Sequence, residues 1–281
     1  MKHAIYDIHL AAEARQAIEM QKPVVALEST VITHGLPFPV NLELARDMEF
    51  EVRQQHGVPA TVGVVDGKMY VGLDGGQLER LATDKKTVKV SVRDFGAAIA
   101  FGRSGGTTVA GTMLAANLAG IRVFATGGIG GVHRDTVFDI STDLTQLART
   151  PMVVVCAGAK AILDLPATLE VLETYGVPVV GYQTDEFPAF YSRGSGLPVS
   201  VRADTAEQVA RIAGEHWGLG LTSAVLVCVP PPEEAALPAE AVQAAIEQAL
   251  REARTANIHG QAVTPFLLQR VGELTHGSSM Q

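Results

Sequence analysis

The chain has few aromatic residues and no cluster of positive charge, and these shortages argue against nucleic-acid polymers as partners. Aromatic residues are only 5% of the 281 residues and are not interleaved with basic ones, so a base-stacking surface is not supported. Lys and Arg number 22 against 30 Asp and Glu, which gives a net charge of -8. An acidic chain without a basic patch has little attraction for a phosphate backbone. If a nucleotide binds, we expect a free one.

Cysteine and long hydrophobic runs are also scarce. The two cysteines, Cys156 and Cys228, each lie inside a short apolar run, which predicts buried thiols rather than a disulfide or a metal pair and indicates a reducing compartment. No apolar run approaches the length of a transmembrane helix, and the first twenty residues lack a hydrophobic segment of the signal-peptide type. We therefore expect a cytoplasmic protein with no membrane partner.

Hydrophobic residues make up 47% of the chain, which is enough for a sizeable core. Short β-branched runs alternate with segments of helical periodicity. This pattern predicts an α/β fold, a three-layer α/β/α sandwich around a largely parallel (mixed) sheet, in a single domain of residues 1–281. The Asp66-Gly67 pair predicts a hairpin added to the sheet. The expected strands are 24–27, 60–65, 68–71, 88–92, 121–125, 152–156, 177–182 and 224–229; the expected helices are 8–20, about 41–55, 109–118, 165–175 and 239–256; and 102–108 is expected to be a glycine-rich turn.

Two reactive side chains lie just beyond the carboxyl ends of predicted buried strands. In open α/β sheets ligands bind beyond the carboxyl ends of the strands, where Glu28 and Lys160 would lie. The small residues Ala157-Gly158-Ala159 leave room beside Lys160. A lysine kept from bulk water can be a neutral amine that attacks a carbonyl to form a Schiff base; a surface lysine at the start of a helix is an equally common alternative. Glu28 is a candidate general acid or, alternatively, a turn cap or the partner of an arginine.

Asp139 and Asp143 are the candidate metal ligands. Their four-residue spacing places both on one face of a helix, and on a strand they also share a face, so either element would bring the carboxylates together. Adjacent carboxylates repel unless a cation or proton lies between them, and oxygen ligands without a nearby cysteine favour Mg²⁺ or Mn²⁺ over Zn²⁺. The alternative is a pair of solvated surface acids or a helix cap.

Two glycine-rich stretches are candidate functional segments. The stretch Ser104–Thr108 precedes a helix of small residues, whose amino terminus favours phosphate, with Lys89 as the balancing charge; packing alone is the alternative. The run 127–131 has four glycines in five positions, which is entropically unfavourable unless the backbone approaches something closely or stays mobile. It lacks the spacing of a dinucleotide site. His34 and His133 are expected to be hydrogen-bonded structural or substrate-contacting side chains rather than metal ligands.

Six stretches together resemble one known family. They are Ala26-Leu27-Glu28-Ser29-Thr30, Gly106-Thr107-Thr108-Val109-Ala110, Phe124 to Arg134, Phe138-Asp139-Ile140-Ser141, Val155-Cys156-Ala157-Gly158-Ala159-Lys160 and Thr264-Pro265-Phe266-Leu267-Leu268. In this order they are similar to the pseudouridine-5'-phosphate glycosidases, also called the indigoidine synthase A-like family, over roughly Pro23 to Thr275. The resemblance implies a metal-dependent C-glycosidase of nucleotide metabolism, of lyase or hydrolase type, and a homotrimer. Its substrate would be pseudouridine 5'-phosphate, split with water into uracil and ribose 5-phosphate in a reversible reaction.

The resemblance also implies a role for each matched position. Lys160 falls at the nucleophile and Glu28 at the proton donor. Asp139 falls at the ligand of one Mn²⁺ per subunit, which Mg²⁺ or another divalent ion can replace, with Asp143 reaching the ion through water. The substrate contacts that it implies are Lys89, Thr108, Val109 and Thr126 on the phosphate side, His133 near the base, and Ser141, Thr142 and Asp143 beside the metal.

The chemistry of the bond gives an independent reason for a lysine. A carbon-carbon glycosidic bond has no nitrogen or oxygen leaving group to protonate, so an electron sink is needed. If Lys160 opens the ribose and forms an iminium at C1', the adjoining bond can break once the uracil C5 carbon is protonated, with Glu28 as the source of that proton. The paired-carboxylate scheme of O-glycosidases requires no such lysine.

Two departures from the family pattern keep other functions open. The segment between His133 and Asp139 is shorter than in relatives, and the chain stops at Gln281, where relatives continue through an asparagine-containing segment and a further helix. One alternative is another Schiff-base lyase or aldolase of sugar phosphates that shares Lys160 and the phosphate loop. A second is a nucleotide-binding protein that lacks turnover because of its short carboxyl end.

Overall fold

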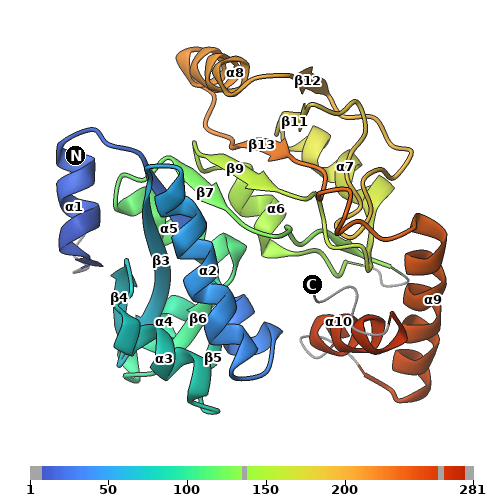
Figure 1. Ribbon diagram of the computed structural model, residues 1–281, viewed down its shortest axis with the longest axis horizontal. Coiled ribbons are helices and arrows are strands. Elements are labelled where there is room, and N and C mark those ends of the chain that lie inside the picture. Colours follow the sequence, from blue (N-terminus) through green and yellow to red (C-terminus); the bar gives the residue numbers. More distant parts are fainter. Residues whose placement is uncertain (1–7, 135–137, 259–262, 276–281) are drawn as a thin grey trace. The chain divides into compact units, whose positions relative to one another are not determined.

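The computed structural model describes residues 8–134, 138–258 and 263–275 (Figure 1). The described chain forms two compact units. The first contains residues 8–126 and 150–153, and the second contains residues 127–134, 138–149, 154–258 and 263–275. The single domain expected from the sequence stays a prediction.

The first unit is built on strands with one hairpin. Its strands are β1 (Ile8–Leu10), β2 (Val24–Leu27), β3 (Val58–Val65), β4 (Lys68–Val71), β5 (Val88–Val90), β6 (Gly105–Thr107) and β7 (Val123–Ala125). They run in the order β1-β4-β3-β2-β7, with β6 pairing both β3 and β5. β2 is parallel to β3 and β7, whereas β4 and β6 are antiparallel to β3. β3 and β4 form the predicted hairpin, in which Asp66 and Gly67 have the positive φ angles, 49° and 71°, of a primed turn.

Helices pack against these strands. They are α1 (Ala12–Glu19), the π-helical turn η1 (Val31–Gly35), α2 (Val40–Gln54), α3 (Gly75–Thr83), the 3₁₀ turn η2 (Val92–Asp94), α4 (Phe95–Ala100) and α5 (Val109–Leu118). Buried side chains of η1, α2 and α3 form one apolar cluster, which includes Ile32, Leu42 and Leu81. The helices predicted over 41–55 and 109–118 are therefore confirmed, within one residue for the first.

Two predictions for this unit are wrong. Ile8 does not begin a helix, because β1 pairs in parallel with β4 and the amide of Ala11 donates to the carbonyl of Val71 (2.9 Å), so α1 starts only at Ala12. Residues 105–107 are a strand and not part of a turn. Gly105 can lie against β5 because it has no side chain: a Cβ there would meet the Val88 carbonyl oxygen at 2.2 Å.

The second unit contains a parallel set of strands and a small antiparallel pair. Its strands are β8 (Val132–His133), β9 (Val153–Cys156), β10 (Leu163–Asp164), β11 (Val179–Tyr182), β12 (Val201–Ala203) and β13 (Val225–Cys228). The first residue of β9, Val153, is counted with the first unit. The order is β9-β13-β11-β12, and β8 pairs with β10. β12 was not predicted, since Val201 and Arg202 are exposed and no apolar run marks the strand. Together with the first unit, these strands confirm the α/β class and the largely parallel, mixed sheet.

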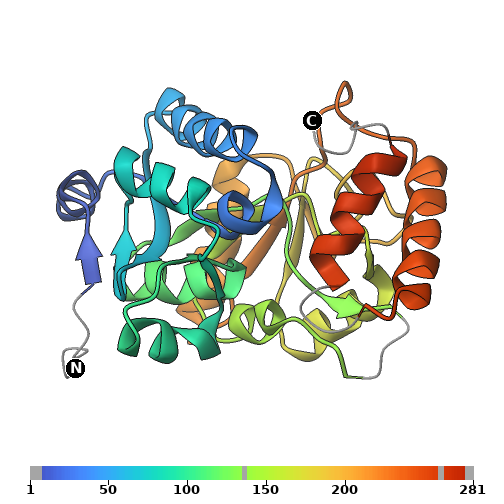
Figure 2. The same ribbon diagram turned by 90° about the horizontal axis from the view of Figure 1, so that it is seen from below.

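The helices of the second unit are α6 (Thr142–Leu147), α7 (Leu165–Thr174), α8 (Ala206–Gly218), α9 (Ala239–Thr255) and α10 (Val263–Leu274). Figures 1 and 2 show α9 and α10 side by side. Cys156 and Cys228 lie on β9 and β13 as free, buried thiols, as predicted. Burial is the larger cause that raises the pKa of Cys228, and the neighbouring Cys156 thiol raises it further, so this sulfur stays protonated at neutral pH.

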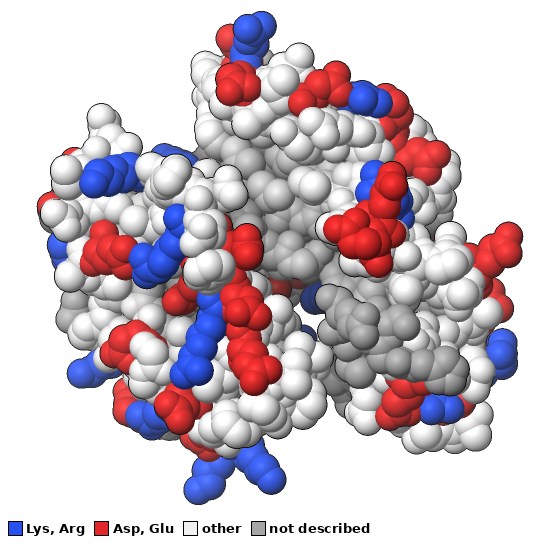
Figure 3. Space-filling view, viewed as in Figure 1, with Lys and Arg blue, Asp and Glu red and all other residues white. Residues whose placement is uncertain are grey.

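The surface agrees with the composition. Figure 3 shows acidic and basic side chains interspersed over the face in view. Among the helices of the described residues, none is both long enough and apolar enough to cross a membrane.

Candidate active site

The candidate proton donor, Glu28, follows β2 in the first unit. Leu27 pairs with Ala125 across the parallel strands β2 and β7, so the next residues, Glu28 and Thr126, leave the sheet side by side. The Thr126 hydroxyl donates a hydrogen bond of 2.5 Å to Oε1 of Glu28. Glu28 is only 9% exposed, so this carboxyl is nearly removed from water and oriented by a neighbouring hydroxyl. The predicted strand-end position of Glu28 is confirmed.

A buried hydroxyl network fixes the residue that follows Glu28. Ser29 donates its hydroxyl hydrogen to the carbonyl of Val62, and the same oxygen accepts the amide of Thr107 at 2.9 Å. Thr107 also bonds Val62 and the hydroxyl of Thr112 (2.9 and 2.8 Å). Gly106 allows this close approach, since a Cβ there would meet the Ser29 carbonyl oxygen at 2.5 Å. The loop that carries Glu28 is thus tied to the glycine-rich segment before α5.

That segment ends at the candidate phosphate site. Thr108 is the N-cap of α5: its hydroxyl accepts the amide of Gly111 at 3.2 Å, and its own amide donates to Val90 at 3.0 Å. Val109 is the first helical residue, and the leading amides of a helix have no intrahelical acceptor. Such a terminus, with its positive dipole end, is suited to an anion.

Lys89 lies on β5, which is paired with β6 in the same segment. Burial is the larger cause that lowers the pKa of His34, and the positive charge of Lys89 lowers it further. His34 is therefore neutral at pH 7, and Lys89 supplies the local charge. The Nδ1 atom of His34 lies 2.7 Å from the Thr33 hydroxyl. His34 is therefore a hydrogen-bonded side chain, as predicted.

In the second unit, the glycine run 127–131 owes its composition to close packing. A Cβ on Gly128 would meet the Phe190 ring at 2.5 Å, one on Gly130 would meet the Ser141 hydroxyl at 2.3 Å, and one on Gly131 would meet the Thr168 hydroxyl at 2.3 Å. The sequence left close approach and mobility open for this run, and the structure shows close approach.

Lys160 follows β9 on a segment held by its backbone. The amide of Lys160 donates to the carbonyl of Ile129 (3.0 Å), and its carbonyl accepts the amide of Leu163 (2.9 Å). Gly158, at φ +88°, lies so close to Pro188 that a Cβ would meet the Pro188 carbonyl oxygen at 2.2 Å. Lys160 is half-buried, and among the described residues of its unit the amine has no hydrogen-bond or ion-pair partner. The backbone is fixed while the nitrogen stays available.

Asp139 and Asp143 do not share a regular element, so both predicted geometries for the pair are wrong. Ser141 is the N-cap of α6 and accepts the amide of Asp143 (3.2 Å), which leaves Asp139 outside the helix. Asp143 is 6% exposed, and its Oδ2 accepts the amide of Gly130 at 2.8 Å. Asp143 thus has a role in holding the glycine run, while Thr142 opens α6 with an exposed side chain.

Asp139 and His133 lie on the same loop. The amide of His133 donates to the carbonyl of Asp139 at 2.9 Å, and His133 is paired with Leu163 of β10, three residues after Lys160. The Asp139 carboxylate is half-buried and has no hydrogen-bond or ion-pair partner among the described residues of its unit. His133, Asp139 and Lys160 are thereby joined through one backbone network.

Asp139 is the predicted metal ligand, and its carboxylate is the one acidic group among the described residues of this loop that could hold a divalent cation. In the part of the chain that the structure describes, no three or more His, Cys, Asp and Glu side chains form a group that could hold a metal. A cage of three protein ligands of these types is therefore not formed there. One available carboxylate, with water or substrate oxygens completing the shell, is the arrangement that Mg²⁺ and similar hard cations accept.

The fold and these side chains define an α/β protein with a phosphate-type helix terminus in one unit and an available strand-end lysine in the other. The chain matches the family model described as indigoidine synthase A like protein over residues 13–281. It belongs to this family.

Curated relatives carry one name. A pseudouridine-5'-phosphate glycosidase of Chloroflexus aurantiacus is 55% identical over 280 residues, which are 98% of this chain and 92% of that protein. Another of the same name, from Caldanaerobacter subterraneus subsp. tengcongensis, is 51% identical over 276 residues, 98% of this chain and 90% of its own length.

Solved structures agree with the fold. The prealnumycin C-glycosynthase AlnA, in complex with ribulose 5-phosphate, superposes with a TM-score of 0.89 at 43% identity and covers 96% of this chain and 89% of its own. An indigoidine synthase A-like protein from Thermotoga maritima has a TM-score of 0.89 at 36% identity, with coverage of 100% and 91%.

The structure assigns the predicted residues to two sets. Glu28, Lys89, Thr108, Val109 and Thr126 lie in the first unit, and His133, Asp139, Ser141, Thr142, Asp143 and Lys160 lie in the second. Sequence reasoning missed the bond of Thr126 to Glu28 and the support that Ser29 and Thr107 give. The parallel register of β2 and β7 is the signal that pairs Thr126 with Glu28, and no local pattern marks the buried hydroxyls.

Proposed function

We propose that this chain catalyses the reversible cleavage of pseudouridine 5'-phosphate, with water, into uracil and ribose 5-phosphate. The observation that carries the proposal is Lys160: a half-buried lysine on a backbone held by hydrogen bonds just beyond β9, whose amine has no hydrogen-bond or ion-pair partner among the described residues of its unit. The identity of 51–55% to proteins named pseudouridine-5'-phosphate glycosidase supports the substrate.

Lys160 acts as the nucleophile. Its amine adds to C1' of the ribose, the bond from C1' to the ring oxygen breaks, and that oxygen gains the proton that the nitrogen loses. The nitrogen lone pair then forms the C1' iminium as the bond to uracil breaks, and the uracil C5 carbon gains a proton. Water adds to the iminium, which releases ribose 5-phosphate and returns the amine.

Glu28 supplies the proton to C5. Its carboxyl is almost fully buried, and the Thr126 hydroxyl holds one of its oxygens in place. An inactive Glu28→Gln variant whose Lys160 still forms the imine would agree with this division of roles.

The remaining residues bind and orient the substrate. The amino terminus of α5, with Thr108, Val109 and the charge of Lys89, holds the 5'-phosphate. In this proposal His133 contacts the base, and Ser141, Thr142 and Asp143 hold the substrate beside the metal. A divalent cation, Mn²⁺ or Mg²⁺, held by Asp139 with Asp143 reached through water, would supply positive charge to substrate oxygens.

A uracil-release assay on pseudouridine 5'-phosphate, with and without chelator, tests the proposal. We expect release that a chelator stops and that added Mn²⁺ restores. No release at any metal concentration, with binding of the nucleotide retained, would instead indicate a nucleotide-binding protein without turnover. For the assembly we propose a cytoplasmic homotrimer, by the resemblance to the family, which light scattering after gel filtration tests.

The second candidate function is the same kind of reaction on a C-glycoside other than pseudouridine 5'-phosphate. It is favoured by the likeness to a C-glycosynthase at 43% identity, a lower value than for the named glycosidases. Incubation of the chain with ribose 5-phosphate and either uracil or a larger aromatic acceptor separates the two. Product from uracil alone supports the first candidate, and reaction with neither acceptor leaves a Schiff-base lyase or aldolase.

A further inference from the structure

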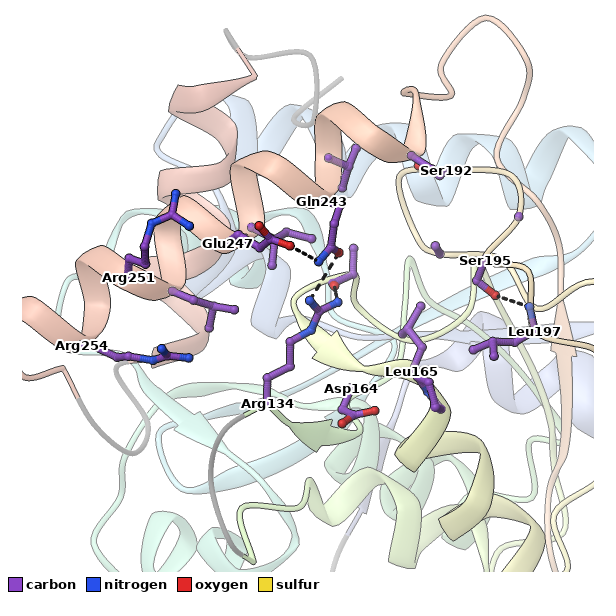
Figure 4. Close-up of a pocket in the computed structure, with 18 residues that line it drawn as sticks. Arg134, Asp164, Leu165, Ser192, Ser195, Leu197, Gln243, Glu247, Arg251 and Arg254 are labelled. Carbon is purple, nitrogen blue, oxygen red and sulfur yellow. Dashed lines mark hydrogen bonds between the residues drawn. The ribbon is translucent and has the colours of Figure 1, made fainter.

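Arg134 is bound to the chain segment that directly follows Lys160. Its Nε donates to the carbonyl of Leu163 at 2.9 Å and its Nη2 donates to the carbonyl of Ala161 at 3.2 Å. The third guanidinium contact, from Nη1 to Oε1 of Gln243 on α9, is 3.3 Å long. Figure 4 shows the Arg134 side chain directed at Gln243 within a cavity of about 760 Å³.

These two carbonyls belong to the turn that sets the direction of Lys160. Lys160 opens the turn, because its carbonyl accepts the amide of Leu163, and Ala161 and Leu163 are only 3% and 2% exposed. Carbonyls in so buried a turn need donors from the protein, and an unpaired one is unfavourable. Arg134 supplies two of these donors from one rigid, planar group.

The same arginine follows His133 directly in the chain. His133 pairs with Leu163 in the two-stranded sheet of β8 and β10, and its amide bonds the carbonyl of Asp139. Arg134 therefore joins the loop of His133 and Asp139 to the turn that begins at Lys160, through its backbone on one side and its guanidinium on the other.

We infer that Arg134 is a positioning residue for Lys160: its guanidinium fixes the turn after Lys160 so that the amine is held in line with C1' of the sugar. This role rests on the proposed function of Lys160 and adds to it. Nothing in the imine chemistry needs Arg134 to touch the substrate, so its loss should slow formation of the imine and leave binding of the sugar phosphate largely intact.

Three variants separate this role from general stability. Arg134→Gln removes the charge and the guanidinium fork, and Arg134→Lys keeps the charge but lacks the planar fork that bonds both carbonyls. Gln243→Ala is the matched control, since it removes the third contact of the guanidinium and leaves both carbonyl bonds. Circular dichroism and thermal unfolding establish that each variant is folded.

The assay is borohydride trapping of ribose 5-phosphate on the metal-loaded protein. Mass spectrometry measures how fast the sugar phosphate becomes covalently attached at Lys160. At saturating ribose 5-phosphate, we expect Arg134→Gln to lower the trapping rate about 100-fold, the size of effect that a small misplacement of a reacting group produces. The half-saturating concentration should change less than about threefold. Arg134→Lys should fall between, and Gln243→Ala should match the wild type.

Each other outcome is decisive. A folded Arg134→Gln variant that traps the sugar at the wild-type rate would overturn the inference while leaving the proposed function standing. Loss of affinity with an unchanged maximal rate, or loss of folding in both Arg134 variants, would also overturn it. Absence of trapping in the wild type would instead reject the proposed function of Lys160.

Discussion

Replacement of Gly130 by alanine is expected to damage the second unit severely, because this glycine lies against two groups that hold α6 in place. A Cβ at position 130 would be 2.3 Å from the Ser141 hydroxyl oxygen and 2.8 Å from Oδ2 of Asp143. Neither atom is the end of a long flexible side chain, and Asp143 is buried. Relief of the overlap must therefore disturb the Ser141 cap, the bond from the Gly130 amide to Asp143, or both.

The magnitude follows from those contacts. Loss of a helix cap is worth about 1 kcal/mol, loss of a hydrogen bond to a buried carboxylate about 1.5–3 kcal/mol, and overpacking about 1–3 kcal/mol. One movement causes all three, so they do not add fully, and we expect a loss of about 3–5 kcal/mol in unfolding free energy. The same chain offers a matched control in Gly127, where a Cβ would be 3.7 Å from the Phe190 ring, an ordinary contact. Gly127→Ala should change stability by about 1 kcal/mol or less.

Urea unfolding followed by tryptophan fluorescence measures the difference. The single tryptophan, Trp217, lies on α8 in the second unit, where its indole N–H donates to the Ser223 carbonyl at 3.0 Å. Its emission therefore reports on the unit that contains Gly130. Equal stability of the Gly130→Ala and Gly127→Ala variants would refute the reasoning, since the two differ in the space available to a Cβ.

Three further predictions concern Lys160, Thr108 and the half-buried acid Glu49. Lys160→Ala should abolish uracil release and borohydride trapping without changing the circular dichroism spectrum, because no described partner in its unit depends on the amine; turnover near the wild-type rate would exclude the imine route. Thr108→Ala should raise the ribose 5-phosphate concentration needed for half-maximal trapping and lower stability by about 1 kcal/mol, whereas Thr145→Ala, at an exposed helical site, should do neither. Burial raises the pKa of Glu49 above its ordinary 4.5, against the lowering effect of the Thr61 hydroxyl. Glu49 thus binds its proton more tightly in the folded state, so its contribution to the free energy of unfolding falls as pH rises above 4.5. In urea titrations Glu49→Gln should therefore gain stability relative to wild type between pH 4.5 and 7. A difference in unfolding free energy that does not change with pH would contradict this.

Residues that act through local pattern were predictable from the sequence. Glu28 and Lys160 follow β-branched runs that form β2 and β9, and the Asp66-Gly67 pair forms the hairpin turn. Asp164 caps α7 through the amide of Ala167 (3.0 Å), as its position before a helical segment indicates. In each case the signal lies within a few residues of the group it places.

Residues that act through distant contacts could not be predicted from local sequence patterns. Asp143 bonds Gly130, thirteen positions away, and this bond is specified by tertiary packing and not by the spacing to Asp139. Ser29 meets Thr107 across 78 positions, and Arg134 reaches Gln243 across 109. Such pairings depend on which strands become neighbours, which periodicity alone does not determine.

The two candidate reactive groups are supported in the same way. Each lies beside backbone that another side chain holds: Arg134 bonds the carbonyls after Lys160, and Ser29, directly after Glu28, bonds the Thr107 amide. An amine that is itself bonded in a network loses availability as a nucleophile, so rigidity has to come through the neighbouring backbone. Ser29→Ala should therefore lower uracil release without removing any reacting atom, and Ser29→Thr should restore part of it if the hydroxyl bond to the Thr107 amide is the support. Equal activity of Ser29→Ala and wild type would show that the Glu28 loop is held by other contacts.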